Sequence, residues 1–139
     1  MSANHKDFYW PVRVYYEDTD AAGIVYYANY LKFMERARTE WLRSFSFNQD
    51  QLRLEHKIIF AVTRLNTQYR SPARLDDQLC VSVRVARIGA ASFNLDQHIL
   101  GTDGERLYDA EVRIACLNAD NLKPRKLPSF LLTELRRED

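Results

Sequence analysis

Two aspartates, Asp18 and Asp20, lie in the short segment Asp18–Gly23, between a strand-like run and a long helical pattern. Aspartate is common in Asx-turns and at helix N-caps, so a purely structural role is one interpretation. A calcium loop of the EF-hand type is excluded, because its fifth and twelfth positions would be Ala22 and Asn29 instead of an oxygen ligand and a bidentate acid. A phosphate-binding loop needs more glycines and a lysine than this segment has.

The chemistry that such a segment suits is attack on a carbonyl group. A helix N-terminus presents unpaired N–H groups and a partial positive charge. Aimed at a carbonyl oxygen, these groups stabilise developing negative charge, as an oxyanion hole does. A nearby carboxylate then attacks the carbonyl carbon or activates a water. Thioesters are good electrophiles that do not require a full Ser-His-Asp set, and Gly23 would let the backbone approach a substrate closely.

The elements that must position this segment follow from hydrophobic periodicity. A strand is predicted over Val12–Glu17, which is rich in β-branched and aromatic residues. A long helix is predicted next, because apolar residues recur at three- and four-residue intervals and form one stripe. The stripe consists of Leu31, Met34, Ala37, Trp41, Leu42 and Phe45. A shorter helix is predicted over Asn48–Glu55.

After the second helix the period changes to alternation, which is typical of an antiparallel sheet with one buried face. Strands are predicted over 58–70, 79–86, 91–96 and 110–117, and a short helix after Pro128. One helix cannot cover a five-stranded sheet unless the sheet curls around it, and the free sheet edge invites pairing with a second copy. The sequence therefore predicts an α+β hotdog fold, a five-stranded antiparallel sheet wrapped around a long central helix, as one domain over residues 1–139.

Composition excludes several other classes of protein. The formal net charge is +1, which gives no electrostatic indication of nucleic-acid binding. Cys80 and Cys116 lie in strand-like runs without the spacing of a zinc site, so both are expected to be buried and free. The polar start, residues 1–7, does not resemble a signal peptide, and no apolar run approaches about 18 residues. These patterns predict a cytoplasmic protein without a transmembrane segment, a metal or a cofactor.

Several blocks of the sequence resemble a known family. Residues 13–30, Arg-Val-Tyr-Tyr-Glu-Asp-Thr-Asp-Ala-Ala-Gly-Ile-Val-Tyr-Tyr-Ala-Asn-Tyr, resemble the signature of 4-hydroxybenzoyl-CoA-type thioesterases. The resemblance continues through residues 33–42 and 69–77 and ends near 123–128. Together with Trp10–Arg13, the later blocks are most similar to the Tol–Pal-associated acyl-CoA thioesterases of Gram-negative bacteria.

The resemblance implies an acyl-CoA substrate and a role for each residue of the loop. The catalytic carboxylate of the family falls at Asp20, and Asp18 becomes a supporting residue that orients the loop containing Gly23. The backbone N–H that polarises the thioester carbonyl falls at Tyr27. Many relatives carry His at that position, so the implied role belongs to the N–H and not to the side chain. The resemblance also implies a homodimer or homotetramer with active sites at the dimer interface.

Other polar residues are weighed against structural roles. Glu35 and Arg38 are interpreted as a partly buried helix pair at i, i+3, and an approach of Glu35 to the thioester is the functional alternative. His56 lies at a helix–strand junction without a motif and is a minor candidate for a base. Arginines that are candidates for binding coenzyme A phosphates, with Ser92 as a weaker helper, are Arg70, Arg74, Arg84 and Arg87.

A basic cluster of Lys123, Arg125 and Lys126 precedes the apolar residues of the expected last helix. The favoured interpretation is a capping helix that docks on the domain. The alternative is a surface that contacts anionic lipid of the inner membrane or an acidic acyl carrier protein.

Two further function classes stay open. A hydratase or dehydratase on this fold pairs an acid with a catalytic histidine, but neither the loop nor the long helix contains a histidine. A non-catalytic scaffold that binds acyl-CoA or acyl carrier protein in phospholipid synthesis is the other alternative. The presence of Asp20 favours catalysis, whereas tight binding without turnover would favour the scaffold.

Overall fold

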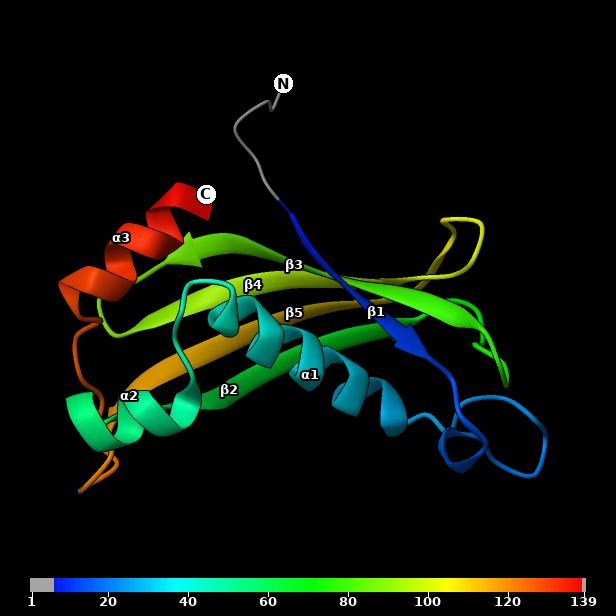
Figure 1. Ribbon diagram of the computed structural model, residues 1–139, viewed down its shortest axis with the longest axis horizontal. Coiled ribbons are helices and arrows are strands. Elements are labelled where there is room, and N and C mark those ends of the chain that lie inside the picture. The colour runs from blue at the N-terminus through cyan, green and yellow to red at the C-terminus, as the bar shows by residue number, and fades with distance from the viewer. Residues whose placement is uncertain (1–6, 139) are drawn as a thin grey trace.

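A curved antiparallel sheet partly encloses one long helix in the computed structural model, which describes residues 7–138 (Figure 1). The polar segment 1–6 lies outside the described residues. The elements in chain order are β1 (Phe8–Arg13), a 3-10 turn (Tyr16–Asp18), α1 (Asn29–Arg43), α2 (Gln49–His56), β2 (Ile58–Tyr69), β3 (Gln78–Ile88), β4 (Ser92–Leu100), β5 (Arg106–Asn118) and α3 (Ser129–Glu138). The strand order is β1-β3-β4-β5-β2, so β1 and β2 form the two edges. The predicted α+β hotdog architecture is confirmed.

The core lies between α1 and the concave face of the sheet. The side chains that α1 buries share one face of the helix and are Tyr30, Phe33, Met34, Ala37, Trp41 and Leu42. Along β4 buried and half-buried residues alternate strictly, with Phe93, Leu95 and Ile99 facing the helix. This alternation matches the two-residue period of a strand, so the opposite residues of β4 form an outer, polar face.

The predicted first strand is shifted in the structure. β1 begins at Phe8 and ends at Arg13, whereas residues 12–17 were expected to form the strand. The chain leaves the strand because the buried Asp18 carboxylate accepts the Tyr15 N–H at 2.9 Å and stabilises a 3-10 turn. Such local side-chain bonds compete with ladder bonds. Pro11 is tolerated because β1 lies at an edge.

The predicted apolar stripe of the long helix is wrong at Leu31, which is 39% exposed. The helix buries Tyr30 in its place, and Leu31 faces an open flank of the helix that contains part of the candidate site. Phe45 lies just beyond the helix and is half-buried.

Helix α3 docks on the domain, as the favoured interpretation predicted. Leu131 and Leu135 are fully buried in the core, and Arg125 donates a hydrogen bond to the His56 carbonyl at 2.6 Å. The apolar stripe of this helix is therefore not free to contact lipid. Within residues 7–138, no helix has the length and apolar character needed to span a membrane.

Candidate active site

The Asp20 loop is a tight, hydrogen-bonded turn. Thr19 and Val25 form an isolated antiparallel bridge, the Asp20 N–H donates to the Ile24 carbonyl at 2.9 Å, and the Gly23 N–H donates to the Asp20 carbonyl at 3.0 Å. Gly23 has a φ of +80°, which L side chains rarely adopt, and a Cβ at this position would meet nothing within 4 Å. The turn conformation therefore explains this glycine, and the close approach of its backbone to substrate stays a prediction.

The two aspartates of the loop have different environments. Asp18 is buried; its carboxylate accepts the Tyr15 N–H, and its backbone carbonyl accepts the Tyr26 N–H at 3.0 Å. Asp20 is exposed, and one of its carboxylate oxygens accepts the Ala22 N–H at 2.9 Å in an Asx-turn. Its second oxygen has no partner among the described residues. Because Asp18 is buried, only Asp20 exposes an oxygen that can attack a carbonyl carbon or accept a proton from water.

The start of α1 has no cap. Ala28 occupies the N-cap, no side chain accepts from the first-turn N–H groups, and the first turn contains no acid. Across residues 7–138, the Tyr27 N–H finds no acceptor. The positive end of a helix dipole and a free N–H donor therefore lie a few residues along the chain from the free oxygen of Asp20.

A second loop holds the helix start in place. The Val25 N–H donates to the Ala73 carbonyl at 2.8 Å, and the Ala73 N–H donates to the Tyr30 hydroxyl at 3.0 Å. The Tyr69 hydroxyl donates to the Tyr27 carbonyl at 3.1 Å. Burial raises the pKa of Tyr30, so its hydroxyl stays neutral near pH 7. The sequence blocks around residues 20 and 73, which are far apart in the chain, thus form one site.

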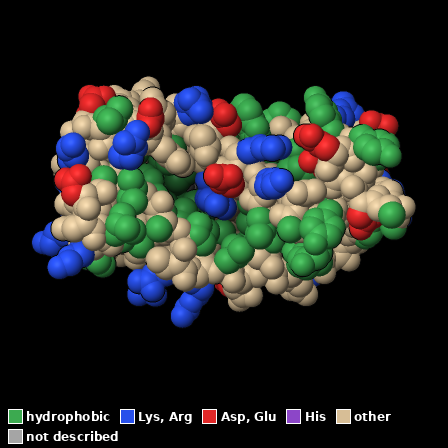
Figure 2. Space-filling model, turned by 90° about the horizontal axis from the view of Figure 1, so that it is seen from below, with side chains coloured by type: hydrophobic (Ala, Val, Ile, Leu, Met, Phe, Trp, Pro, Cys, Tyr) green, Lys and Arg blue, Asp and Glu red, His purple; other side chains and the backbone are tan. Residues whose placement is uncertain are grey.

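One side of α1 lies across from β2, because residues of both elements line a common pocket. Leu31, Glu35, Arg38 and Leu42 recur at intervals of three and four residues and form one stripe of this side of α1, and Tyr27 precedes the helix at the same spacing. The concave-face residues of the β2 edge lie across from it and are Phe60, Val62, Leu65 and Tyr69. Hydrophobic side chains border a hollow on this flank of the molecule, with charged side chains nearby (Figure 2).

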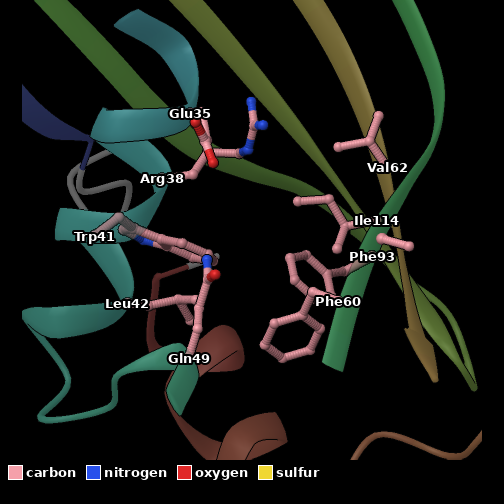
Figure 3. Close-up of a pocket in the computed structure, with 10 residues that line it drawn as sticks. Glu35, Arg38, Trp41, Leu42, Gln49, Phe60, Val62, Phe93 and Ile114 are labelled. Carbon is pink, nitrogen blue, oxygen red and sulfur yellow. The ribbon is translucent and has the colours of Figure 1, made fainter. Parts of the chain in front are cut away.

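The later residues of this stripe border a pocket of about 130 Å³ (Figure 3). The pocket lies between α1, the start of α2 and the strands, and its lining consists of Glu35, Arg38, Trp41, Leu42, Gln49, Phe60, Ala61, Val62, Phe93 and Ile114. Most of these side chains are apolar, so the pocket suits an apolar group.

Arg38 and Glu35 interact through their charges, but no hydrogen bond or ion pair joins them in the described part of the chain. The Arg38 guanidinium donates to the side-chain carbonyl of the buried Gln97 at 3.0 Å, and Gln97 in turn donates to the Met34 carbonyl at 3.2 Å. Burial lowers the pKa of Arg38, and the charge of the exposed Glu35 opposes this shift. Arg38 therefore places a half-buried cation beside the apolar pocket.

The candidate phosphate-binding arginines divide into paired and free ones. Arg70 forms an ion pair with Asp109, and Arg84 forms one with Asp7 at 2.6 Å, so both are already neutralised. Arg87 has no ion-pair partner among the described residues. Arg74 is exposed and its backbone bridges to Ile24, so it lies at the other end of the sheet, beside the Asp20 loop.

Two further arginines, which sequence reasoning missed, join Arg87 on the outer face of the sheet. Arg64 and Arg113 lie directly opposite each other on β2 and β5, and Asn94 of β4 links Arg113 to Arg87 in register. Like charges in such pairs are destabilising, so this row is a poor choice for stability alone. With Ser92 they line a hollow of about 650 Å³. Only the strand register reveals this row, because the residues are distant in sequence.

The turn between β3 and β4, which borders the basic hollow, and the Asp20 loop lie at opposite ends of the sheet (Figure 1). β3 begins beside the loop, where the Val14 N–H donates to the Asp77 carbonyl, and ends at the turn that borders the hollow. The 11 residues of β3 span about 33 Å at roughly 3.3 Å per residue. Within one chain, the Asp20 loop and the basic hollow are therefore far apart.

His56 is exposed and lies at the end of α2, away from the Asp20 loop, and its ring contacts Phe130. Cys116 is buried, Cys80 is half-buried, and both are free thiols. In the part of the chain that the structure describes, no three His, Cys, Asp or Glu side chains are arranged to hold a metal ion.

Comparisons with known proteins identify the family of this chain. The sequence profile of the thioesterase-like superfamily matches residues 14–135. The acyl-CoA thioester hydrolase YbgC of Escherichia coli O6:H1 is 43% identical over 93% of this chain and 96% of its own length. The acyl-CoA thioesterase YbgC of Haemophilus influenzae is 43% identical over 87% of this chain and 88% of its own. The crystal structure of a probable thioesterase from Bartonella henselae superposes with a TM-score of 0.83 at 37% identity, covering 88% of this chain and 100% of that one.

The fold, the profile match over most of the chain and these relatives agree with the resemblance stated from the sequence. The chain belongs to the thioesterase-like superfamily and is a thioester hydrolase with the hotdog fold.

Proposed function

We propose that the chain hydrolyses acyl-CoA to a free acid and coenzyme A at the start of α1. The observation that supports this most is the exposed Asp20 carboxylate, with one oxygen free, near an uncapped helix start whose Tyr27 N–H has no acceptor. The two YbgC relatives, which are named for acyl-CoA thioester hydrolysis, support the choice of substrate class.

In the proposed reaction, the thioester carbonyl oxygen accepts the Tyr27 N–H, and the helix dipole stabilises the oxyanion. Asp20 attacks the carbonyl carbon, the C–S bond breaks, and coenzyme A leaves as a thiolate that takes up a proton. Water then hydrolyses the resulting anhydride and restores the carboxylate. In the alternative, Asp20 accepts the proton of an attacking water in one step. Asp18 supports the loop in both cases, and Gly23 allows its turn.

The acyl group is assigned to the side of α1 that faces β2. Leu31 is exposed there, one helical turn before Glu35, which lines the apolar pocket of about 130 Å³. An engineered cavity of about 150 Å³ holds a benzene molecule, so this pocket suits a ring or a short chain. Longer chains would have to lie along the exposed side of α1.

A second copy of the chain completes the proposed site. The β2 edge is unpaired and exposes Val62, Leu65 and Tyr69, which makes it a template for strand pairing. Antiparallel pairing of two β2 edges would place the Asp20 end of each chain beside the basic end of its partner. Free Arg87 and Arg113 would then bind coenzyme A phosphates for the Asp20 of the partner subunit. The expected assembly is a homodimer or a homotetramer.

The cellular setting stays a prediction. A cytoplasmic location, an acyl carrier protein partner and association with the Tol–Pal machinery rest on sequence patterns and resemblance. The organisation of residues 1–139 as one domain is likewise a proposal.

The test is thiol release from a panel of acyl-CoAs, from acetyl to palmitoyl with benzoyl forms, by the unchanged protein and by Asp20→Asn. Asparagine keeps the size but attacks poorly and is not a base, so we expect the variant to lose at least about 10³-fold in kcat. Thr19→Ser, on the neighbouring loop residue, is the matched control. Tight binding of acyl-CoA without thiol release by the unchanged protein would replace the enzyme with the scaffold.

A further inference from the structure

Hydrogen bonds hold the backbone on both sides of Tyr26, and the peptide unit that follows Tyr26 carries the Tyr27 N–H. The Tyr26 N–H donates to the Asp18 carbonyl at 3.0 Å, and the Tyr26 carbonyl accepts the Asn29 backbone N–H at 2.8 Å. The side-chain amide of Asn29 also donates to the Asp18 carbonyl, at 2.9 Å. These three hydrogen bonds form a closed ring through Asp18, Tyr26 and Asn29.

The ring has a geometric consequence for the proposed oxyanion donor. The Tyr26 carbonyl and the Tyr27 N–H belong to one planar peptide unit and point in opposite directions. Any bond that fixes the carbonyl also fixes the direction of the N–H. A backbone bond from position 29 survives most substitutions, so the side-chain amide is the part of the ring that depends on asparagine.

The Asn29 side chain does not act as a helix cap. A capping asparagine accepts a hydrogen bond from a helical N–H through its oxygen, as Asn48 does for Gln51 at 2.7 Å. Asn29 uses its nitrogen to donate to a carbonyl outside the helix. Its partner is well anchored, because Asp18 is buried and its carboxylate is bonded to the Tyr15 N–H.

We propose that Asn29 is a positioning residue for the reaction, because its side-chain amide ties the first turn of α1 to the Asp18 carbonyl and thereby directs the Tyr27 N–H. This inference rests on the proposed function, in which that N–H binds the thioester oxygen. The backbone bond from Asn29 still aligns the Tyr27 N–H with the helix when the amide is lost, but nothing from position 29 then ties the helix start to Asp18. The first turn of α1 and the donor shift together relative to the Asp20 loop, while the substrate-binding surfaces stay in place. The effect therefore falls on kcat and not on KM.

The test compares Asn29→Ala with Asn29→Gln, which keeps the amide donor on a longer arm. We expect the alanine variant to lose about 10- to 100-fold in kcat with KM within about threefold, since small misplacements cost up to about 100-fold. The glutamine variant should recover part of this loss. If the alanine variant does not fold, Asn29→Ser, which is too short to reach the Asp18 carbonyl, takes its place.

Asn48→Ala is the matched control, because it removes an asparagine at the other helix start, and its side chain lies outside the pocket lining. It should lower the melting temperature without changing kcat. A readout independent of activity is amide hydrogen exchange at the Tyr26 N–H, measured by NMR, which should accelerate in Asn29→Ala and not in Asn48→Ala.

Full kcat in Asn29→Ala beside an inactive Asp20→Asn would overturn the inference and leave the proposed function standing. Unchanged exchange at Tyr26 would also overturn it. Absence of thiol release by the unchanged protein would refute the proposed function, and the catalytic role of Asn29 with it.

Discussion

Helices α1 and α2 begin in opposite ways. The start of α2 is capped by Asn48, carries Asp50 in its first turn, and adds an ion pair between Asp50 and Arg53 at 2.7 Å. The start of α1 has none of these features. Both helices belong to the same chain and face the same solvent. The difference must therefore come from how each helix packs and from the function of each helix start.

Packing accounts for the first part of the difference. Helix α1 buries six side chains over 15 residues, whereas the 8-residue α2 buries only Leu52. Short helices are marginal in water without caps or packing, so α2 depends on local bonds. Helix α1 is held by the core, so its start needs no side-chain cap and the Tyr27 N–H can stay free. The comparison teaches that an uncapped helix start is tolerated where packing is strong, and it suggests function where a free carboxylate lies nearby.

The largest expected effect concerns packing. Phe33→Ala removes a fully buried ring from α1 and should lower the free energy of unfolding by about 3–5 kcal/mol. Leu54→Ala, at a position of α2 that is 58% exposed, should change it by less than about 0.5 kcal/mol. Urea denaturation measures both variants. Similar losses at the two positions would contradict the claim that packing holds α1.

The next effect concerns the free donor itself. Proline has no N–H, so Tyr27→Pro deletes the proposed oxyanion donor and should lower kcat by about 10²–10³-fold. Tyr27→Ala keeps the N–H and should show a far smaller loss, because the side chain is 62% exposed. Steady-state kinetics with the preferred acyl-CoA decides between them. Equal losses in the two variants would assign the role to the tyrosine side chain.

An acidic residue at the start of α1, as in α2, should raise the stability of the fold and lower kcat. Ala28→Asp places a carboxylate at the open helix start, where it should stabilise the fold by about 0.3–1 kcal/mol. The same charge opposes an oxyanion and should lower kcat about 10-fold or more. Ala28→Asn, which is similar in size but uncharged, is the control. A kcat that is unchanged in Ala28→Asp would mean that no negative charge develops at this end of the helix.

The smallest expected effect comes from removing the cap of α2. Asn48→Ala uncaps α2 and should cost about 0.5–2 kcal/mol in the free energy of unfolding while kcat stays the same. Thermal unfolding and thiol release on the same sample measure both quantities. A loss below the error of the measurement would show that α2 does not depend on its cap.

Sequence patterns predicted the helices and strands of this protein better than they predicted which residues are buried and where the first strand begins and ends. Periodicity identified α1 but placed Leu31 in the core, because the pattern does not distinguish an apolar residue that faces the core from one at the exposed side of the helix. The first strand was displaced because a tertiary pairing with β3 selected Phe8–Arg13, while Asp18 bonded locally. Both effects depend on contacts that a linear pattern does not contain.

In the candidate site, too, the sequence indicated some features, whereas others depend on tertiary contacts. The spacing of Asp18 and Asp20 indicated a turn with chemistry, but not which carboxylate is buried. Arg64 and Arg113 could be grouped only from the register of β2 with β5, where a bulge between Val62 and Arg64 shifts the pairing. The role of the Asn29 amide depends on a bond to a residue 11 positions away in sequence.

The central claim is that the open start of α1 binds the thioester carbonyl. A crystal structure of Asp20→Asn with a bound acyl-CoA tests it most directly, because the slow variant retains the uncleaved substrate. We expect a carbonyl oxygen about 2.7–3.1 Å from the Tyr27 nitrogen, with the nucleotide phosphates against Arg87 of the partner subunit. A thioester bound elsewhere, or a carbonyl that points away from Tyr27, would contradict it.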